Sequence, residues 1–331
     1  MRLIQFETPQ GSRKVGKIRG WDIEVIPHAS SVRELALAAI RTGEPLERHV
    51  HALGIEGHED YRIVLSEGRV LPPLDHADHA HCLVSGSGLT HLGSASTRDS
   101  MHRGAGRRET GPSDAMRLFK SGMAGGRPAE GQAGIATGWF YKGDGAIVVR
   151  PGAAIPVPDF ADDAGEEPEL AGLYVIGDDG APYRIGFAIG NEFADHGTEG
   201  KNYLYLAHSK LGYCSFGPEL YVGALPATLI GMSRIRREGR VIWEREFISG
   251  QDHMSHSIEN LEYHHFKYNQ FLRPGDVHVH FFGAPALSFA DGVHIQSGDT
   301  FEISIPEFGE PLTNAVTSSR PRVAMNGVAV L

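Results

Sequence analysis

Glu166-Glu-Pro-Glu-Leu170 runs directly into the apolar stretch Ala171-Gly-Leu-Tyr-Val-Ile176. The apolar residues predict a buried strand, and the acidic residues stand at its beginning. In an extended chain, side chains two residues apart point to the same side, so Glu167 and Glu169 are expected to project together. Two neighbouring carboxylates raise each other's pKa unless a cation lies between them. The stretch therefore offers two ligands for a cation, although these residues alone favour an acidic loop in water.

A third acidic residue changes that balance. Residues Ile185 to Ile189 are apolar and lead into Gly190-Asn-Glu192. Glu192 lies 23 residues after Glu169, a separation that accommodates a strand, a turn and a returning strand. Three carboxylates can then converge on one ion, and Mg²⁺ prefers such oxygen ligands. The sequence therefore predicts a metal site formed by Glu167, Glu169 and Glu192.

The rest of the chain predicts a β-rich α+β fold. The 331 residues are 41% hydrophobic, enough for a sizeable core, and they include 42 glycines and 19 prolines, which suggest many short strands and turns. No regular alternation of strand and helix is visible. Strand patterns occur at Ala146-Ile-Val-Val149, Gly172–Ile176, Ile185–Ile189, His278–Phe282 and Thr300–Ile305.

Residues 1–75 are expected to form a small α+β module. Arg13–Val25 is compatible with a hairpin, and Ser31 and Glu34 have the spacing of a helix capping box, with Gly43 at the end of that helix. The stiff segment Leu71-Pro-Pro-Leu74 then connects the module to the remaining residues.

Residues 76–331 are expected to form the catalytic domain. Within them, the segment 103–138 is rich in Gly, Arg, Ser and Ala and is a candidate lid. We expect helices from Ser113 to Phe119 and from Ser257 to Tyr268.

Charge and composition exclude several classes of function. The formal net charge is −10, and the nearest basic cluster, Arg103 with Arg107 and Arg108, lies among glycines and suggests a solvated loop. A nucleic-acid partner is therefore not expected. Cys82 and Cys214 are far apart, which favours a reducing compartment. The chain starts without a leader pattern and has no apolar run of the roughly 20 residues that a membrane span needs, so a cytoplasmic protein without a membrane partner is expected.

The acidic motifs resemble those of the fumarylacetoacetate hydrolase family. That family carries Glu-x-Glu before a strand and then Gly-Tyr-x-x-x-Asn-Asp, which supplies a third metal ligand. Here these motifs read Glu167-Pro-Glu169 and Gly186-Phe-Ala-Ile-Gly-Asn-Glu192. Glu in place of Asp keeps the carboxylate but adds one methylene group.

Later motifs follow in the order that the family shows. Its lysine segment resembles Ser209-Lys-Leu-Gly-Tyr-Cys-Ser-Phe-Gly-Pro218, and its closing segments resemble Leu272-Arg-Pro-Gly-Asp-Val277 and Phe282-Gly-Ala-Pro285. Ile295-Gln-Ser-Gly-Asp299 and Leu312-Thr-Asn314 complete the series. Each motif is weak alone, but together they extend the resemblance over residues 80 to 316.

The resemblance implies a mixed β-roll like the family's C-terminal domain, a homodimer or homotetramer, and Mg²⁺ or Mn²⁺ that binds a small 2-keto acid. Lys210 would be a base or a positive group that holds the keto acid. His91 would be an acid, or would only hydrogen-bond its loop. The substrate contacts expected from the resemblance are Ser85, Ser87, Arg98 and Ala284.

One position separates hydrolysis from dehydration. Hydrolytic members carry His-x-x-Glu, a pair that activates water, whereas this chain reads His91-Leu-Gly-Ser94. A serine hydroxyl cannot replace the carboxylate, which removes part of a general-base contribution of about 10²–10⁴. A branch of the family dehydrates 2-keto-3-deoxy-D-pentonates to 2,5-dioxopentanoate and needs no activated water. We therefore expect a dehydratase, with hydrolysis of an acylpyruvate or 2,4-diketo acid as the alternative.

Two further alternatives stay open. The chain has 18 histidines, and His278 with His280 on one strand face suggests a cupin-like metal site, but no third ligand stands at matching spacing. A non-catalytic sugar-acid-binding protein would keep the carboxylates and tolerate loss of Lys210 and His91.

Overall fold

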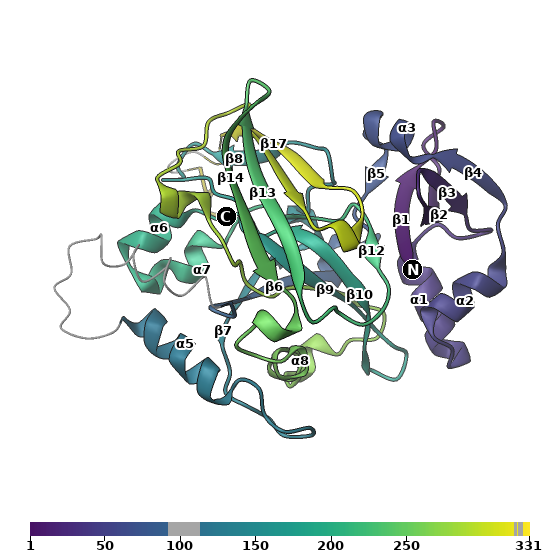
Figure 1. Cartoon of the computed structure of the whole chain (residues 1–331), viewed down its shortest axis with the longest axis horizontal. Helices are drawn as coiled ribbons and strands as arrows, with labels where there is room; N and C mark the ends of the chain where they lie inside the picture. The colour runs from purple at the N-terminus through teal and green to yellow at the C-terminus, as the bar shows by residue number, and fades with distance from the viewer. Residues whose placement is uncertain (92–112, 321–322, 324–326) are drawn as a thin grey trace.

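A computed structural model describes residues 1–91, 113–320, 323 and 327–331. It shows a β-rich mixture of strands and helices with two mixed sheets, as the sequence predicts (Figure 1). None of the helices in this described part combines the length and apolarity that a membrane crossing requires.

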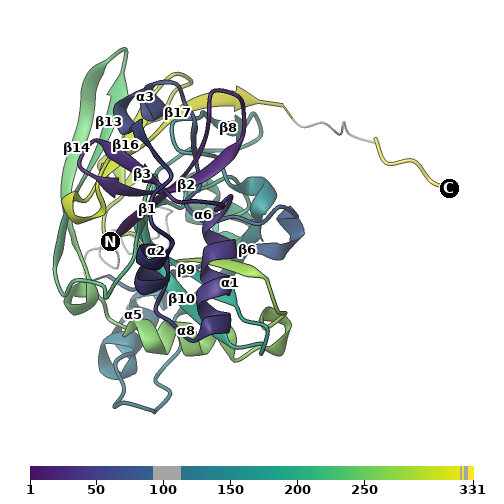
Figure 2. The ribbon, with the colours of Figure 1, turned by 90° about the vertical axis from the view of Figure 1, so that its right-hand side faces the viewer.

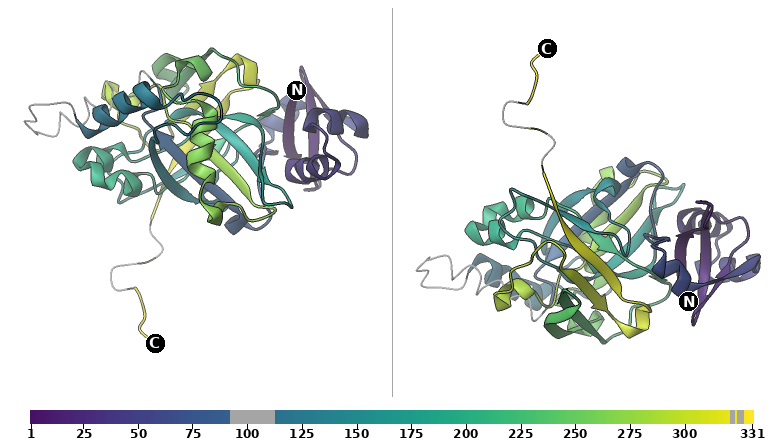
Figure 3. Two further views of the ribbon diagram at one scale, coloured as in Figure 1. Left: turned by 90° about the horizontal axis from the view of Figure 1, so that it is seen from below. Right: turned by 90° about the horizontal axis from the view of Figure 1, so that it is seen from above.

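The N-terminal residues form a small module of strands and helices, which lies at one end of the molecule in Figures 1 and 3. The predicted helix is confirmed, because Ser31 caps it by accepting a hydrogen bond from Glu34 N and Gly43 ends it in the left-handed conformation. The elements are β1 (Arg2–Glu7), β2 (Arg13–Arg19), β3 (Asp22–Val25), α1 (Val32–Thr42), α2 (Leu46–Leu53), β4 (Gly57–Asp60), α3 (Tyr61–Ser66) and β5 (Val70–Leu71).

A larger sheet continues from this module through β1, which pairs with β12. The strand order is β4-β3-β2-β1-β12-β10-β9-β15-β6-β7, and β15 runs parallel to β6. Because hydrogen bonds join the two parts in one sheet, the division at residue 75 stays a prediction. The further strands are β6 (Cys82–Gly88), β7 (Gly138–Asp144), β9 (Pro168–Ile176), β10 (Pro182–Asn191), β11 (Ser215–Phe216), β12 (Leu220–Tyr221) and β15 (Val277–Phe281).

A second sheet has the order β14-β13-β16-β17-β8 and stands at the outer face of the body in Figure 2. It contains β8 (Ile155–Pro158), β13 (Leu229–Arg237), β14 (Arg240–Ser249), β16 (Thr300–Ser304) and β17 (Leu312–Ser319). The remaining helices are α5 (Asp114–Gly125), α6 (His196–Lys201), α7 (Leu206–Ser209) and α8 (Ile258–Phe266). Short 3₁₀ turns are η1 (His79–His81), η2 (Gly145–Ile147), η3 (Tyr203–Tyr205), η4 (Gln251–His253), η5 (Asn269–Phe271), η6 (Ser288–Asp291) and η7 (Pro306–Phe308).

Alternate residues of β9 face two separate cores, as the period of a strand requires. Ala171 and Leu173 pack in the core that includes the inner residues of β6 and β15. Leu170 and Tyr174 pack in the core that α8 and the second sheet share. Glu169 is two residues before Ala171, so its side chain points to the same face of the sheet as Ala171 and Leu173.

One predicted strand is wrong. The stretch Ala146 to Val149 forms the 3₁₀ turn η2 and then a single bridge from Val148 to Cys214. Asp144 explains the difference, because its side chain accepts a hydrogen bond from Ala146 N and starts a turn. The candidate lid is only partly visible, since residues 103–112 lie outside the described ones and α5 occupies the part after them.

A chain of neutral histidines crosses the second core. Trp139 Nε1 donates to His265 Nδ1 at 3.0 Å, and His265 Nε2 lies 3.0 Å from His278 Nδ1. An indole N–H can only donate, so His265 must carry its proton on Nε2 and donate it to His278. Burial lowers the pKa of His278 to about 4 and that of His280 to about 3. This face of the sheet therefore depends on uncharged imidazoles.

We expect the protein to lose stability in mild acid. The pKa of His278 is lower in the folded protein than its ordinary 6.5, so the unfolded chain binds the proton first. The contribution of His278 is complete above about pH 6.5 and is lost as the pH falls toward 4. Urea unfolding midpoints measured across this range test the expectation. His278→Asn keeps an acceptor near Nδ1 but cannot be protonated, so its decline should be shallower. Equal slopes for the two proteins would contradict the assignment.

Candidate metal centre

The three predicted glutamates meet where β9 begins and β10 ends. The antiparallel register places Gly190 opposite Glu169, and Glu192 N donates to Glu167 O at 3.1 Å beyond the last strand pair. Each carboxylate offers one oxygen, and these oxygens lie within 4.8 Å of one another. All three side chains are buried, with at most 3% of their surface exposed. The geometry is that of an oxygen-only site for a small, hard cation.

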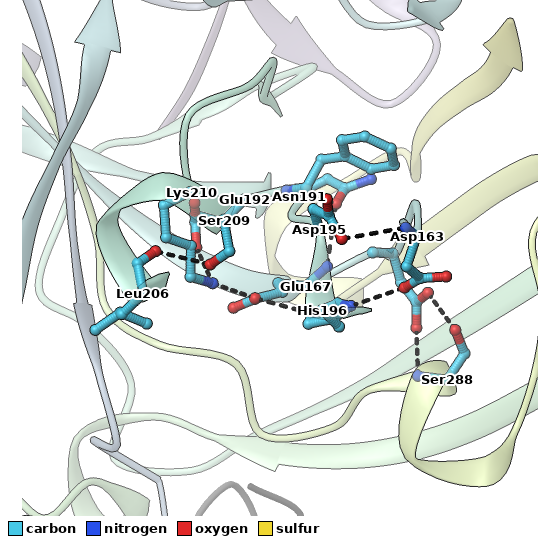
Figure 4. Close-up of polar contacts among 12 residues, drawn as sticks. Asp163, Glu167, Asn191, Glu192, Asp195, His196, Leu206, Ser209, Lys210 and Ser288 are labelled. Carbon is cyan, nitrogen blue, oxygen red and sulfur yellow. Dashed lines mark hydrogen bonds and ion pairs between the residues drawn. The ribbon is translucent and has the colours of Figure 1, made fainter. Parts of the chain in front are cut away.

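Asn191 fastens the two segments that carry these ligands. Its side-chain oxygen accepts hydrogen bonds from Glu167 N and Phe193 N, both at 3.2 Å. The carboxylates on either side of Asn191 are thereby held at a fixed separation. Figure 4 shows Asn191, Glu192 and Glu167 gathered around this clasp.

Two buried lysines enter the cluster. Lys210 follows α7, and its Nζ contacts Glu167 Oε1 and lies 2.8 Å from Glu192 Oε2 (Figure 4). Lys142 of β7 lies 2.7 Å from Glu192 Oε1 and donates to the carbonyl oxygens of Phe193 and Lys210, both at 2.8 Å. Lys142 thus makes two hydrogen bonds to carbonyl oxygens and one ion pair with Glu192, whereas Lys210 contacts two different carboxylates of the cluster.

Glu169 is the carboxylate of the cluster whose charge most needs compensation. Burial raises the pKa of Glu169 well above its ordinary value, and repulsion from Glu192 and Glu167 raises it further. Its Oε2 accepts a hydrogen bond from Gly283 N at 2.6 Å, which orients the carboxylate. A divalent cation would relieve this repulsion, and carboxylate oxygens are the donors that Mg²⁺ and Mn²⁺ take. The residues present therefore fit such an ion.

Other polar side chains surround the ligands. Burial would lower the pKa of His196, but hydrogen bonds with Asp163 and Glu167 outweigh it and raise the pKa to about 9. Burial raises the pKa of Glu166 to about 7, although Ser288 N and Oγ both donate to that carboxylate. Figure 4 shows Ser288 on the far side of Asp163 and His196 from Lys210.

The sequence did not single out Lys142, His196 or Asp163 as site residues. Lys142 carried one usable signal, because it is a lone lysine directly after three aromatic residues, Trp139 to Tyr141. His196 stands four residues after Glu192, but it is one of 18 histidines. Only the folded chain distinguishes it from the others.

The other predicted site residues lie in different surroundings. His91 is buried, with its Nε2 2.9 Å from Ser249 Oγ and its Nδ1 3.2 Å from Thr90 Oγ1, and burial lowers its pKa to about 4. Ala284 is buried directly after Gly283, the residue that holds Glu169. Arg98, predicted to bind substrate, lies outside the described residues.

Ser85 and Ser87 are not brought to the carboxylates. Ser85 is paired with His280 across β6 and β15, and His280 with Gly172 of β9. Paired residues share a face, and Gly172 is three residues after Glu169, so the serines point to the opposite side of the sheet. Ser87 Oγ accordingly lies 2.9 Å from His280 Nε2.

Comparison with solved structures finds the same architecture along almost the whole chain. The chain matches 2-keto-3-deoxyarabinonate dehydratase in a hexagonal crystal form, with a TM-score of 0.72 at 20% identity, over 97% of this chain and 100% of that one. The same coverage and identity hold for 2-keto-3-deoxy-D-arabinonate dehydratase complexed with magnesium and 2,5-dioxopentanoate, at a TM-score of 0.71. The chain has the fumarylacetoacetate hydrolase fold.

This fold is shared with more than one kind of enzyme. A 2-hydroxyhepta-2,4-diene-1,7-dioate isomerase from Mycobacterium marinum matches with a TM-score of 0.58 at 19% identity, over 96% of this chain and 99% of that one. Comparisons with protein-family models and with curated protein sequences give no match. The fumarylacetoacetate hydrolase fold therefore leaves the reaction to be argued from the site.

We expect metal binding to release protons. Because the raised pKa of Glu169 makes protons compete with the cation for its carboxylate, affinity for Mn²⁺ should increase with pH. Calorimetric titration of chelator-treated protein with Mn²⁺, in buffers of different ionisation enthalpy, measures the protons released. Glu169→Gln cannot ionise and should bind Mn²⁺ weakly, with less proton release. Affinity that is independent of pH and unchanged in Glu169→Gln would rule out this site.

Proposed function

We propose that the protein is a metal-dependent dehydratase that converts a 2-keto-3-deoxy-D-pentonate to 2,5-dioxopentanoate with loss of water. The observation that carries the proposal is the buried cluster of Glu167, Glu169 and Glu192 with Lys210 placed between two of its carboxylates. The fold shared with a dehydratase complexed with magnesium and 2,5-dioxopentanoate supports it. Ser94, where hydrolytic members carry glutamate, favours dehydration over hydrolysis.

The three carboxylates would hold Mg²⁺ or Mn²⁺, which supplies a Lewis acid for the carboxylate and keto oxygens of the substrate. Lys210 contacts both Glu167 and Glu192, which places its amine beside the site where the keto acid would bind. A neutral Lys210 amine can then accept the proton from C3 of the substrate. Lys142 instead keeps its ammonium on Glu192 and on the carbonyl oxygen of Lys210, which holds the base in place.

The departing C4 hydroxyl needs a proton donor, and His91 is the residue proposed for it, although burial lowers the pKa of His91 to about 4, so the imidazole would have to be protonated in the substrate complex to serve as the acid. Its contacts with Ser249 and Thr90 equally suit a histidine that fastens its loop. A His91→Gln variant separates the two roles, because glutamine keeps hydrogen bonds but cannot transfer a proton at neutral pH. We further propose that the enzyme is a cytoplasmic homodimer or homotetramer, which light scattering of the purified protein tests.

The substrate assay compares two carbon skeletons. With Mg²⁺, 2-keto-3-deoxy-D-arabinonate should yield 2,5-dioxopentanoate, detected as a semialdehyde, and a chelator should abolish the product. Cleavage of an acylpyruvate without semialdehyde formation would instead show a C–C hydrolase. If neither compound reacts while the sugar acid still raises the thermal unfolding temperature, the protein is a binding protein.

Replacement of Lys210 by methionine tests its role as the base. Lys210→Met keeps the length of the side chain but removes the amine, so kcat should fall by about 10²–10⁴. The exposed lysine of α6, Lys201, provides the matched control, and Lys201→Met should keep the wild-type rate. Lys210→Met with full kcat at saturating Mg²⁺ would exclude Lys210 as the base.

A further inference from the structure

A buried imidazole bridges a ligand carboxylate and a second carboxylate that is not a ligand. His196 Nε2 lies 3.0 Å from Glu167 Oε1, and its Nδ1 lies 3.5 Å from the carboxylate of Asp163 (Figure 4). His196 has no exposed surface, and the Asp163 side chain is 8% exposed. The ring therefore connects Asp163 to the metal ligand through the protein interior.

The backbone is shaped to admit this ring. Gly165 lies between Asp163 and Glu167, and a Cβ at Gly165 would come within 2.2 Å of His196 Nδ1. Gly165 and Ala194 also exchange two backbone hydrogen bonds of 3.0 Å, which hold the ligand strand against the residues before α6. The ring of Phe289 covers the imidazole at a centroid distance of 5.3 Å.

The position of His196 along the chain is fixed as well. It begins α6 directly after Asp195, whose side chain accepts hydrogen bonds from Thr198 N at 2.9 Å and from Asp163 N at 3.1 Å. Asp195 thus fastens the start of α6 to the segment that carries Asp163. The imidazole is therefore held by its helix, by its hydrogen bond with Glu167 and by its ion pair with Asp163.

We propose that His196, oriented by Asp163, is a positioning residue that fixes the Glu167 carboxylate as a metal ligand. Glu167 Oε1 meets both His196 Nε2 and Lys210 Nζ, so the carboxylate is held from two directions. A carboxylate with its orientation set before binding loses less freedom when a cation arrives. His196 acts through Glu167 and binds neither metal nor substrate. This proposal rests on the proposed metal centre, and it names His196 as a residue that determines the affinity of that centre for the metal.

The test uses Mn²⁺ alone as the probe, titrated calorimetrically into chelator-treated full-length protein. His196→Ala should bind Mn²⁺ about 10- to 100-fold more weakly, the usual cost of losing a partner of a metal ligand. His196→Gln should restore most of the affinity, because its amide nitrogen can reach Glu167 in place of Nε2. Asp163→Ala should weaken binding less than His196→Ala does, since it loosens the ring without removing it.

Three results separate this proposal from a general loss of structure. Circular dichroism of the metal-free variants reports whether they fold. If His196→Ala does not fold, the Mn²⁺ affinities of Asp163→Ala and His196→Gln test the proposal instead: Asp163→Ala should bind more weakly than wild type, and His196→Gln should keep most of the affinity. At saturating Mn²⁺ the kcat of His196→Ala should approach the wild-type value, while half-saturation needs more metal.

Wild-type Mn²⁺ affinity in His196→Ala, with binding lost in Glu169→Gln, would overturn the role of His196 and leave the metal centre intact. Wild-type affinity in both variants would overturn the metal centre itself.

Discussion

The burial of three carboxylates at one strand junction is the constraint on which the rest of the site depends. Removing a charged group from water costs several kcal/mol even after the protein relaxes, unless an opposite charge meets it. Lys142 and Lys210 are buried for this reason, and each contacts a ligand carboxylate. Glu169 receives its hydrogen bond from the backbone N–H of Gly283, and a cation at the cluster would relieve the repulsion that raises its pKa.

The two faces of the central sheet meet opposite electrostatic demands. On one face, Phe140 lies under Lys210 Nζ at 5.4 Å, and Gly86 leaves the space that this ring occupies. On the other face, the same strands carry a neutral chain through His278 and His265. A strand turns successive side chains to opposite faces, so β6, β7 and β15 can serve a charged centre and an uncharged core at once. The charged face depends on ionised glutamates and lysines, whereas the neutral face is destabilised when its imidazoles are protonated.

The fumarylacetoacetate hydrolase fold brings these demands together by its topology. β6 and β15 run parallel and end beside the start of β9, and β10 returns antiparallel to the same edge. Four strand ends therefore contribute backbone and side chains to one place, although they are far apart in the sequence. The N-terminal module extends the same sheet through β1 and β12, and it lies at the far end from α6 and α7 in Figure 1.

The sequence by itself determined the parts that rest on local periodicity and spacing. It predicted a β-rich fold, the capped helix that begins after Ser31, and the convergence of Glu167, Glu169 and Glu192, because two apolar strands of a hairpin must bring their acidic ends together. Its motifs also suggested the fold that the comparisons show. It missed the turn at Ala146, where a single aspartate outweighs a β-branched run.

Only the tertiary structure decided which polar residues from distant segments share the site. Lys142 reaches the carboxylates because β7 lies beside β6. His196 reaches them because Gly165 and Ala194 exchange backbone hydrogen bonds that hold the segment before α6 beside the residues that lead into β9. Neither contact can be recognised from the periodicity of the sequence. The sequence also placed Ser85 and Ser87 of β6 at the site, and the structure turns them to the opposite face of the sheet. A strand pattern predicts that these two serines share a face, but it does not predict which face. That choice depends on the register of β6 against β15 and β9, which is set by pairing across nearly two hundred residues.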